Sequence, residues 1–325
     1  MKKLDKKCER FYNEFIKSCF FWRCQMPEFE RNTTGFTADV EQYNESTLVK
    51  IYRDYVSQAD IDREILCTES VQGRGLPVPE YRGSIQYKGK RAILLEYIRG
   101  QSMMKVLTSG EIPPEELAED FAKIHYQMHQ CRADGLEEGK IRLERLLKRS
   151  ERNLGTDLTT RCLKLMETLP EGNMLCHNDF HPGNILYNDA KEMIVIDWSD
   201  ASCGDPFADV ARTVQMFDYG PSAASGTLVI PTDKTSPEAI DHMKKSRDII
   251  SRFVRRYENK YVELCGLSFS EYEDLVMPWK VIVPASRFDI EWDCNKPAIL
   301  KMMYQYFMTH PLEQKSYFVF EQGGI

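Results

Sequence analysis

The chain has 325 residues, of which 42% are hydrophobic and 29% are charged, and its formal net charge is −7 at pH 7. This composition is that of a soluble globular protein, and the length exceeds what one compact core usually holds, so two lobes are expected. The negative charge argues against a nucleic-acid binder, and no apolar run is long enough to span a membrane. The basic N-terminus lacks the apolar stretch of a secretory signal, and none of the ten cysteines forms a CxxC pair, so we expect a cytoplasmic protein with reduced thiols.

The negative charge is concentrated in the middle of the chain. Between Asp157 and Asp218 there are eleven acidic residues and four basic ones. A field of this sign would attract a divalent metal and a cationic substrate, although an ordinary solvated acidic surface has the same composition.

The first hundred residues predict a small sheet-containing lobe. Apolar residues at helical spacing predict a helix over 4–20, which packs on a lobe or contacts a partner. Residues 28–53 predict three antiparallel strands, and Thr33–Gly35 forms a turn whose glycine could approach phosphates. A helix over 58–71 and two strands joined at 88–90 follow, which makes five strands and one helix.

Lys50 stands out in the third of these strands, between Val49 and Ile51. An unpaired buried ammonium is costly, so the lysine needs an acidic partner. Glu64 lies fourteen residues later on the predicted helix, and Glu69 on the same helix is the alternative.

Beyond residue 100 the pattern is mainly helical. Helices are predicted at residues 113–131, 139–153, 157–169, 205–217, 238–265, 270–284 and 295–309. His125 and His129 are four residues apart and could face one metal ion. Tyr126 stands where a zinc-protease helix would have glutamate, so we interpret both histidines as structural.

Strand character returns at 173–198, in the stretch with the strongest chemical signal. His177, Asp179 and Asn184 follow one another in a polar loop, and residues 185–197 predict a hairpin that returns Asp197 close to Asn184. Phosphoryl transfer needs a carboxylate at the acceptor hydroxyl, oxygen ligands for Mg²⁺ and a lysine for the phosphates. These residue types occur here in that arrangement.

The motif HNDFHPGNIL followed by VIDW resembles the aminoglycoside phosphotransferase and choline kinase family of protein-kinase-like small-molecule kinases. The resemblance implies an α+β, bilobal, protein-kinase-like fold. Its N-terminal nucleotide-binding lobe, residues 1–99, would hold a five-stranded antiparallel sheet plus a helix, and its larger, mainly helical C-terminal lobe, residues 100–325, would bind the substrate. It also implies that Asp179 is the catalytic base and that Asn184 and Asp197 bind Mg²⁺.

The same resemblance implies how the nucleotide is bound. Lys50 and Glu64 match the pair that clamps the phosphates of ATP or GTP. The segment LLEYI resembles the hinge between lobes, where backbone groups of Glu96 and Ile98 would bind the base. The turn at Thr33–Gly35 departs most from the family pattern.

Two further motifs of the family have counterparts that imply structural roles. FAKIHYQMH resembles a family helix with a structural histidine, and GDPFADVART resembles the segment in which Asp205 and Asp209 fix the loop and helix. His177 and His181 would brace the loop. Trp198 replaces the phenylalanine of Asp-Phe-Gly and no Ala-Pro-Glu follows, which argues against a protein kinase.

The acceptor would be a small hydroxylated molecule bound by the C-terminal helices. Asp289, Glu291 and Trp292 combine acids with an aromatic ring, which suits the cation of an aminoglycoside or amino-alcohol, and a sugar-like acceptor is also compatible. Solvated acids on an ordinary helix are the alternative. A catalytically silent nucleotide-binding module and a protein kinase remain alternative functions, and the oligomeric state is open.

Overall fold

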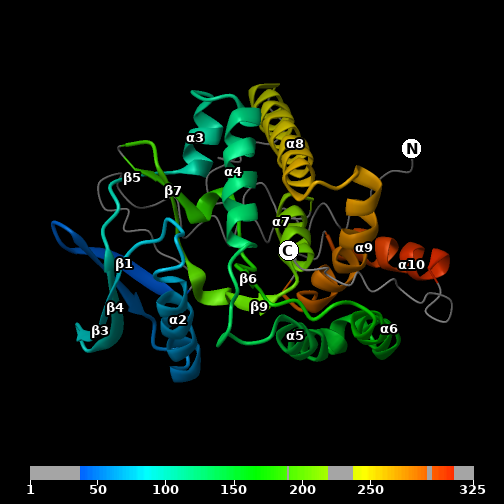
Figure 1. Cartoon of the computed structure of the whole chain (residues 1–325), viewed down its shortest axis with the longest axis horizontal. Helices are drawn as coiled ribbons and strands as arrows, with labels where there is room; N and C mark the ends of the chain where they lie inside the picture. Colours follow the sequence, from blue (N-terminus) through cyan, green and yellow to red (C-terminus); the bar gives the residue numbers. More distant parts are fainter. Residues whose placement is uncertain (1–36, 189, 219–236, 291–294, 311–325) are drawn as a thin grey trace.

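The computed structural model describes residues 37–188, 190–218, 237–290 and 295–310. The predicted helix at 4–20, the Thr33–Gly35 turn, Glu291 and Trp292 lie outside the described residues. Figure 1 shows a small sheet with one helix at one end of the molecule and the helices α9 and α10 at the other. No helix in the described part of the chain is both long and apolar enough to cross a membrane.

An antiparallel sheet of four strands, the N-terminal sheet, forms the first end. Its strand order is β1-β2-β4-β3, with bounds β1 Ala38–Asn44, β2 Thr47–Tyr52, β3 Tyr81–Tyr87 and β4 Lys90–Glu96. The prediction of five strands is corrected to four for the described residues. The sequence pattern was divided into three strands over 28–53, whereas residues 37–53 form one hairpin, and residues 28–36 lie outside the described part.

Helix α2, Gln58–Val71, packs on one face of this sheet and has the bounds that the sequence predicted. Ser57 caps it, because the serine side chain accepts a hydrogen bond from the Asp60 backbone N–H at 3.2 Å. Ile61 on the helix contacts buried sheet residues such as Tyr52 and Ile93. The helix therefore holds its charged residues in a fixed position beside β2.

The rest of the described chain is mainly helical and forms a large apolar core, to which Cys67 and Val71 of α2 also belong. The helices are α3 Met103–Ser109, α4 Pro114–Met128, α5 Gly139–Leu154, α6 Thr156–Glu167, α7 Pro206–Asp218, α8 Pro237–Cys265, α9 Phe269–Ser286 and α10 Lys296–Thr309. The predicted helices match these within a few residues, and only α3 was not predicted. The predicted α+β class is confirmed in outline, while the division into lobes at residue 99 stays a prediction.

Two small sheets lie between the N-terminal sheet and the helices (Figure 1). One has the order β5-β7-β8 and the other pairs β6 with β9, where β5 is Gly100–Ser102, β6 Met174–Cys176, β7 Ile185–Asn188, β8 Met193–Val195 and β9 Ser202–Gly204. The β7–β8 pair is the hairpin that the sequence predicted. Gly100 is required for the pairing of β5 with β7, because a Cβ there would lie 1.8 Å from the Tyr187 carbonyl oxygen.

Candidate active site

Lys50 on β2 joins the N-terminal sheet to the predicted catalytic segment. Its Nζ lies 2.5 Å from Glu64 Oε1 on α2 and 3.1 Å from Asp197 Oδ1, which follows β8 in the chain. Burial disfavours the charged lysine, but Asp197 and Glu64 outweigh this effect and raise the pKa of Lys50 above its usual value. Glu64, rather than the exposed Glu69, is therefore the partner of Lys50.

Asp179 lies in the polar loop after β6, and its side chain is 31% exposed. Arg212 on α7 places Nη2 3.1 Å from Asp179 Oδ1, and His181 Nε2 lies 3.6 Å from Oδ2. Burial alone would raise the pKa of Asp179, but the nearby His181 and the charges of Arg212 and Arg287 lower it. The carboxylate is therefore ionised at neutral pH.

Asn184 ends the short 3₁₀ helix Pro182–Asn184 and is buried. Its Nδ2 donates to the Asp179 backbone oxygen at 2.9 Å, and its own backbone oxygen accepts from Ile196 N–H at 2.9 Å. Because Nδ2 is engaged in this way, the amide oxygen is the atom that Asn184 can offer to a cation.

Asp197 follows Ile196 directly, with a left-handed backbone (φ 61°) that aspartate tolerates better than most residues. Its side chain is 43% exposed. An amide oxygen and a carboxylate, joined by a hairpin, are ligands of the type that Mg²⁺ prefers. Asn184 and Asp197 thus fit a magnesium site.

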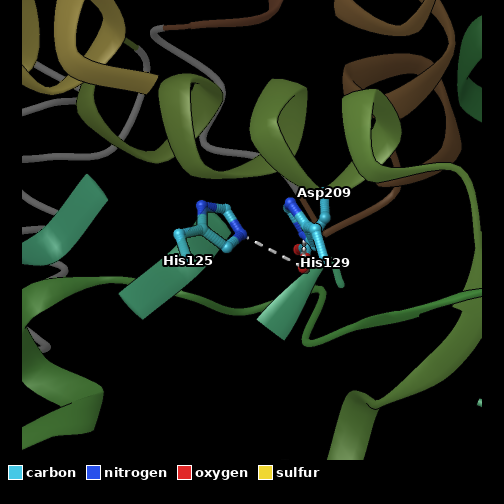
Figure 2. A group of neighbouring side chains, drawn as sticks. All are labelled: His125, His129 and Asp209. Carbon is cyan, nitrogen blue, oxygen red and sulfur yellow. Dashed lines mark hydrogen bonds and ion pairs between the residues drawn. The ribbon is translucent and has the colours of Figure 1, made fainter. Parts of the chain in front are cut away.

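Asp209 on α7 fixes the loop that carries Asp179. Its Oδ2 accepts the backbone N–H of His177 at 2.6 Å, and its Oδ1 accepts that of Asn178 at 2.7 Å. Oδ2 also lies 3.3 Å from the Nε2 atoms of both His125 and His129 on α4, as Figure 2 shows. These contacts outweigh the effect of burial and hold the pKa of Asp209 well below its usual value.

His125, His129 and Asp209 are close enough together to hold one metal ion. Each histidine, however, has a hydrogen-bond partner at both ring nitrogens, because the Nδ1 atoms lie 2.8 Å and 2.6 Å from the hydroxyls of Tyr257 and Tyr261 on α8. Burial lowers the pKa of His125 to about 3, so its ring is neutral. The two imidazole rings and the carboxylate form a complete hydrogen-bond network, in line with the structural interpretation.

The remaining predicted supports occupy bracing positions. His177 is buried and its Nε2 lies 3.1 Å from the Ile196 oxygen, which ties the loop to the end of the hairpin. Asp205 accepts the Phe207 N–H at 2.8 Å at the start of α7 and lies 3.3 Å from the indole nitrogen of Trp279. These contacts match the roles that the resemblance implied for His177 and Asp205.

The predicted acceptor and nucleotide-base residues are placed less favourably. Asp289 is directed into the protein, where its side chain is 5% exposed, lies 2.8 Å from Arg149 Nε and 3.1 Å from Ser150 Oγ. It is therefore already paired. The backbone N–H of Glu96 donates to the Glu80 oxygen at 2.8 Å, so only its carbonyl and the backbone of Ile98, which follows β4, are candidate contacts for a base.

Sequence reasoning missed the arginines of the site. Arg212 was one of only four basic residues in the acid-rich segment, and that isolation was the available signal. Arg63, Arg142 and Arg287 come from three distant segments and meet at Asp200, which no local pattern indicates.

Lys50 on the N-terminal sheet contacts Asp197, and Asp197 is joined to Asn184 by the hairpin, an arrangement of the kind that phosphoryl transfer needs. Residues 30–231 match the model of the phosphotransferase enzyme family. Because this span is more than half of the chain, the chain belongs to that family. The predicted family and the predicted class of enzyme, a phosphotransferase, are confirmed.

Solved structures of aminoglycoside phosphotransferases resemble the chain. APH(4)-Ia is 12% identical with a TM-score of 0.51, and the match covers 92% of this chain and 98% of that one. A thermostable mutant of APH(4)-Ia in its apo form is 13% identical with a TM-score of 0.51, covering 85% of this chain and 92% of that one. A complex of APH(2")-IIa with streptomycin and ATP is 18% identical with a TM-score of 0.47, covering 96% and 99%.

The likeness to APH(4)-Ia concerns the fold, because the identities are low. A search of curated proteins gave no match.

Proposed function

We propose that this protein transfers the γ-phosphoryl group of ATP or GTP to a hydroxyl group of a small molecule. One observation carries the proposal: Lys50 lies within 3.1 Å of Asp197, from which it is separated by 147 residues in the sequence. A buried ammonium between two carboxylates is ready to exchange one of them for nucleotide phosphates.

In this proposal Lys50 binds the phosphates and Glu64 holds Lys50 in place. The purine lies against the backbone of Ile98 and the carbonyl of Glu96. Asn184 and Asp197 would hold Mg²⁺, which when bound neutralises charge on the β- and γ-phosphates.

Asp179 receives the acceptor hydroxyl. The hydroxyl oxygen forms a bond to the γ-phosphorus while the bond from that phosphorus to the bridging oxygen breaks, and the hydroxyl proton passes to Asp179. A carboxylate with a lowered pKa is a weak base, which suits a loose transition state in which the base mainly orients the hydroxyl. Arg212, His181 and Asn184 fix the position of this carboxylate.

The test is transfer of radiolabelled γ-phosphate from ATP and from GTP to a panel of aminoglycosides, amino-alcohols and sugars. We expect Mg²⁺-dependent transfer to at least one hydroxylated small molecule and none to protein. Asp179→Asn should lose transfer and still bind nucleotide. Transfer to protein alone, or full activity of the variant, would contradict the proposal.

A further inference from the structure

Four arginines from separate elements surround two carboxylates, Asp179 and Asp200. Arg63 on α2 lies 3.5 Å from Asp200 Oδ1, and Arg142 on α5 also contacts this atom. Arg287, directly after α9, lies 3.1 Å from Asp200 Oδ2, and Arg212 on α7 lies 3.1 Å from Asp179 Oδ1. We call these four residues the arginine cluster.

The charges of the arginine cluster are not balanced by its two carboxylates. Four positive charges face two negative charges, an excess of two. Glu137 also lies 3.8 Å from Arg63, but it is shared with Arg145 at 3.0 Å, so counting this second pair leaves the excess at two. The same holds for Asp289, which is paired with Arg149 at 2.8 Å. The arginine cluster with its two carboxylates therefore carries a net positive charge, although the sequence segment that carries Asp179 and Asp200 is acidic.

The excess charge is largely shielded from water. The side chains of Arg142, Arg212 and Arg287 are 6%, 15% and 14% exposed. Burial and, after it, the neighbouring charge of Arg287 lower the pKa of Arg212 to about 10, whereas, against the effect of burial, Asp200 and Asp179 raise the pKa of Arg287. Unpaired buried charge is unfavourable, so an arrangement of this kind is expected where an anion completes it.

Two features indicate that the anion arrives with a ligand. The Nε atoms of Arg63 and Arg142 are buried and have no hydrogen-bond partner in the described structure. Asp179 and Asp200 remain 31% and 25% exposed, so a small molecule can reach the cluster at the point where the acceptor hydroxyl is to bind. Guanidinium groups bind carboxylates and phosphates with paired, directional hydrogen bonds.

A cationic acceptor fits this environment poorly. Asp179 and Asp200 already have arginine partners, and Asp289 is turned inward towards Arg149 and Ser150. An ammonium group of an amino sugar would meet guanidinium groups, and like charges in an interface are repelled.

We propose that the acceptor carries, besides its hydroxyl, a small oxyanion (a carboxylate or a phosphate) that binds Arg287 and its neighbours in the arginine cluster. This inference rests on the proposed function, because it takes Asp179 as the residue that receives the hydroxyl. It replaces the cationic acceptor expected from the acidic sequence segment with an anionic one. The γ-phosphate of the nucleotide is the competing anion.

The first experiment compares acceptors that differ in one charged group. Glucose, glucuronate, glucose 6-phosphate and glucosamine form one series, and 1,4-butanediol, 4-hydroxybutyrate and 4-amino-1-butanol form another. We expect kcat/KM to be at least about tenfold higher for an anionic member than for its neutral and cationic counterparts. A preference for the neutral or cationic members would overturn the inference and leave the proposed function intact.

The second experiment does not depend on guessing the acceptor. With a non-hydrolysable ATP analogue and Mg²⁺ present, millimolar malonate or inorganic phosphate should raise the melting temperature of the wild-type protein. The same anions should have no effect on Arg287→Gln. Equal shifts in both proteins, or no shift in the wild type, would overturn the inference.

Steady-state kinetics separate the acceptor from the nucleotide. Arg287→Gln should raise KM for the best anionic acceptor about 10- to 100-fold and leave KM for ATP within about twofold, since a hydrogen bond to a charged group contributes about 1.5–3 kcal/mol. Arg287→Lys keeps the charge and should recover part of the loss. A raised KM for ATP with an unchanged acceptor KM would assign the cluster to the nucleotide phosphates and refute the inference.

Arg252→Gln is the matched control. Arg252 lies on α8, and its side chain, 48% exposed, pairs with Glu115 at 2.6 Å. This variant loses a guanidinium–carboxylate contact of the same kind, but outside the arginine cluster. We expect its kinetics and its response to malonate to equal those of the wild type.

Discussion

Asp209 allows a quantitative test of how the catalytic loop is held. Its carboxylate accepts four hydrogen bonds, two from the backbone N–H groups of His177 and Asn178 and two from His125 and His129. Figure 2 shows the two from the histidines. Replacing Asp209 with asparagine keeps the size of the side chain, removes the charge and turns one acceptor into a donor.

The magnitude follows from the geometry. Three donors point to Oδ2 and one to Oδ1, so the amide oxygen will occupy the Oδ2 position and the amide N–H₂ will face the backbone N–H of Asn178. One buried donor loses its partner, at about 1–3 kcal/mol, and three other hydrogen bonds lose their charge assistance. The total is about 3–5 kcal/mol.

At about 2 °C per kcal/mol for a protein of this size, Asp209→Asn should lower the melting temperature by about 6–10 °C. The loop that carries Asp179 is held by the same bonds, so kcat should fall by about 100-fold even below the melting transition. Calorimetry or circular dichroism gives the first quantity, and steady-state transfer gives the second.

Asp120→Asn is the control, because Asp120 is 39% exposed and makes only a surface ion pair with Lys123. Its effect on stability should stay within about 0.5 kcal/mol. If the free energy of unfolding of Asp209→Asn is within about 1 kcal/mol of the wild-type value and kcat is unchanged, the four hydrogen bonds do not hold the loop as argued.

The other predictions concern the proposed base, the proposed phosphate-binding lysine, acid stability and the β5–β7 pairing. Asp179→Asn should lower kcat by about 10²–10⁴-fold with little change in nucleotide affinity, measured by titration with a fluorescent ATP analogue; weakened binding without loss of turnover would contradict it. Lys50→Met combined with Glu64→Gln, which avoids an unpaired buried carboxylate, should raise KM for ATP at least about tenfold, and an unchanged KM would remove Lys50 from the nucleotide site. His125 has its pKa lowered to about 3 in the folded state, so below pH 6.5 the unfolded state binds a proton that the folded state does not. Its contribution to stability is therefore complete above pH 6.5 and falls with acidification towards pH 3, by at most about 1.4 kcal/mol per pH unit. Urea unfolding at a series of pH values should show that the free energy of unfolding depends less steeply on pH in His125→Gln than in the wild type. Gly100→Ala should lower the melting temperature, because the added methyl group would overlap the Tyr187 carbonyl; an equal melting temperature would show that β5 can shift without loss.

The sequence was enough to predict the chemistry proposed for the site, because the residues concerned lie close together in the chain. Asp179, Asn184 and Asp197 lie within 19 residues, and the turn between β7 and β8 is short enough that the hairpin returns Asp197 to Asn184. The pairing of Lys50 with Glu64 was also readable, since a strand, a turn and two helical turns separate them.

Local periodicity likewise predicted the long helices, because an amphipathic stripe repeats several times within each of them. For α2 both predicted ends agree with the structure. It did not resolve β5, β6 and β9, since three residues are too few to show a period. The number of strands in the described sheet was predicted wrongly for a related reason. The turn residues between 28 and 53 allow this segment to be divided into strands in more than one way.

Only the tertiary structure decided the electrostatics around the base. The segment that carries Asp179 and Asp200 is acidic by composition, and composition alone predicted a site for cations. Arg63, Arg142 and Arg287 reverse this sign because packing brings α2, α5 and the end of α9 together at Asp200. Coulomb energy depends on distance in space, and distance along the chain carries no information about such contacts.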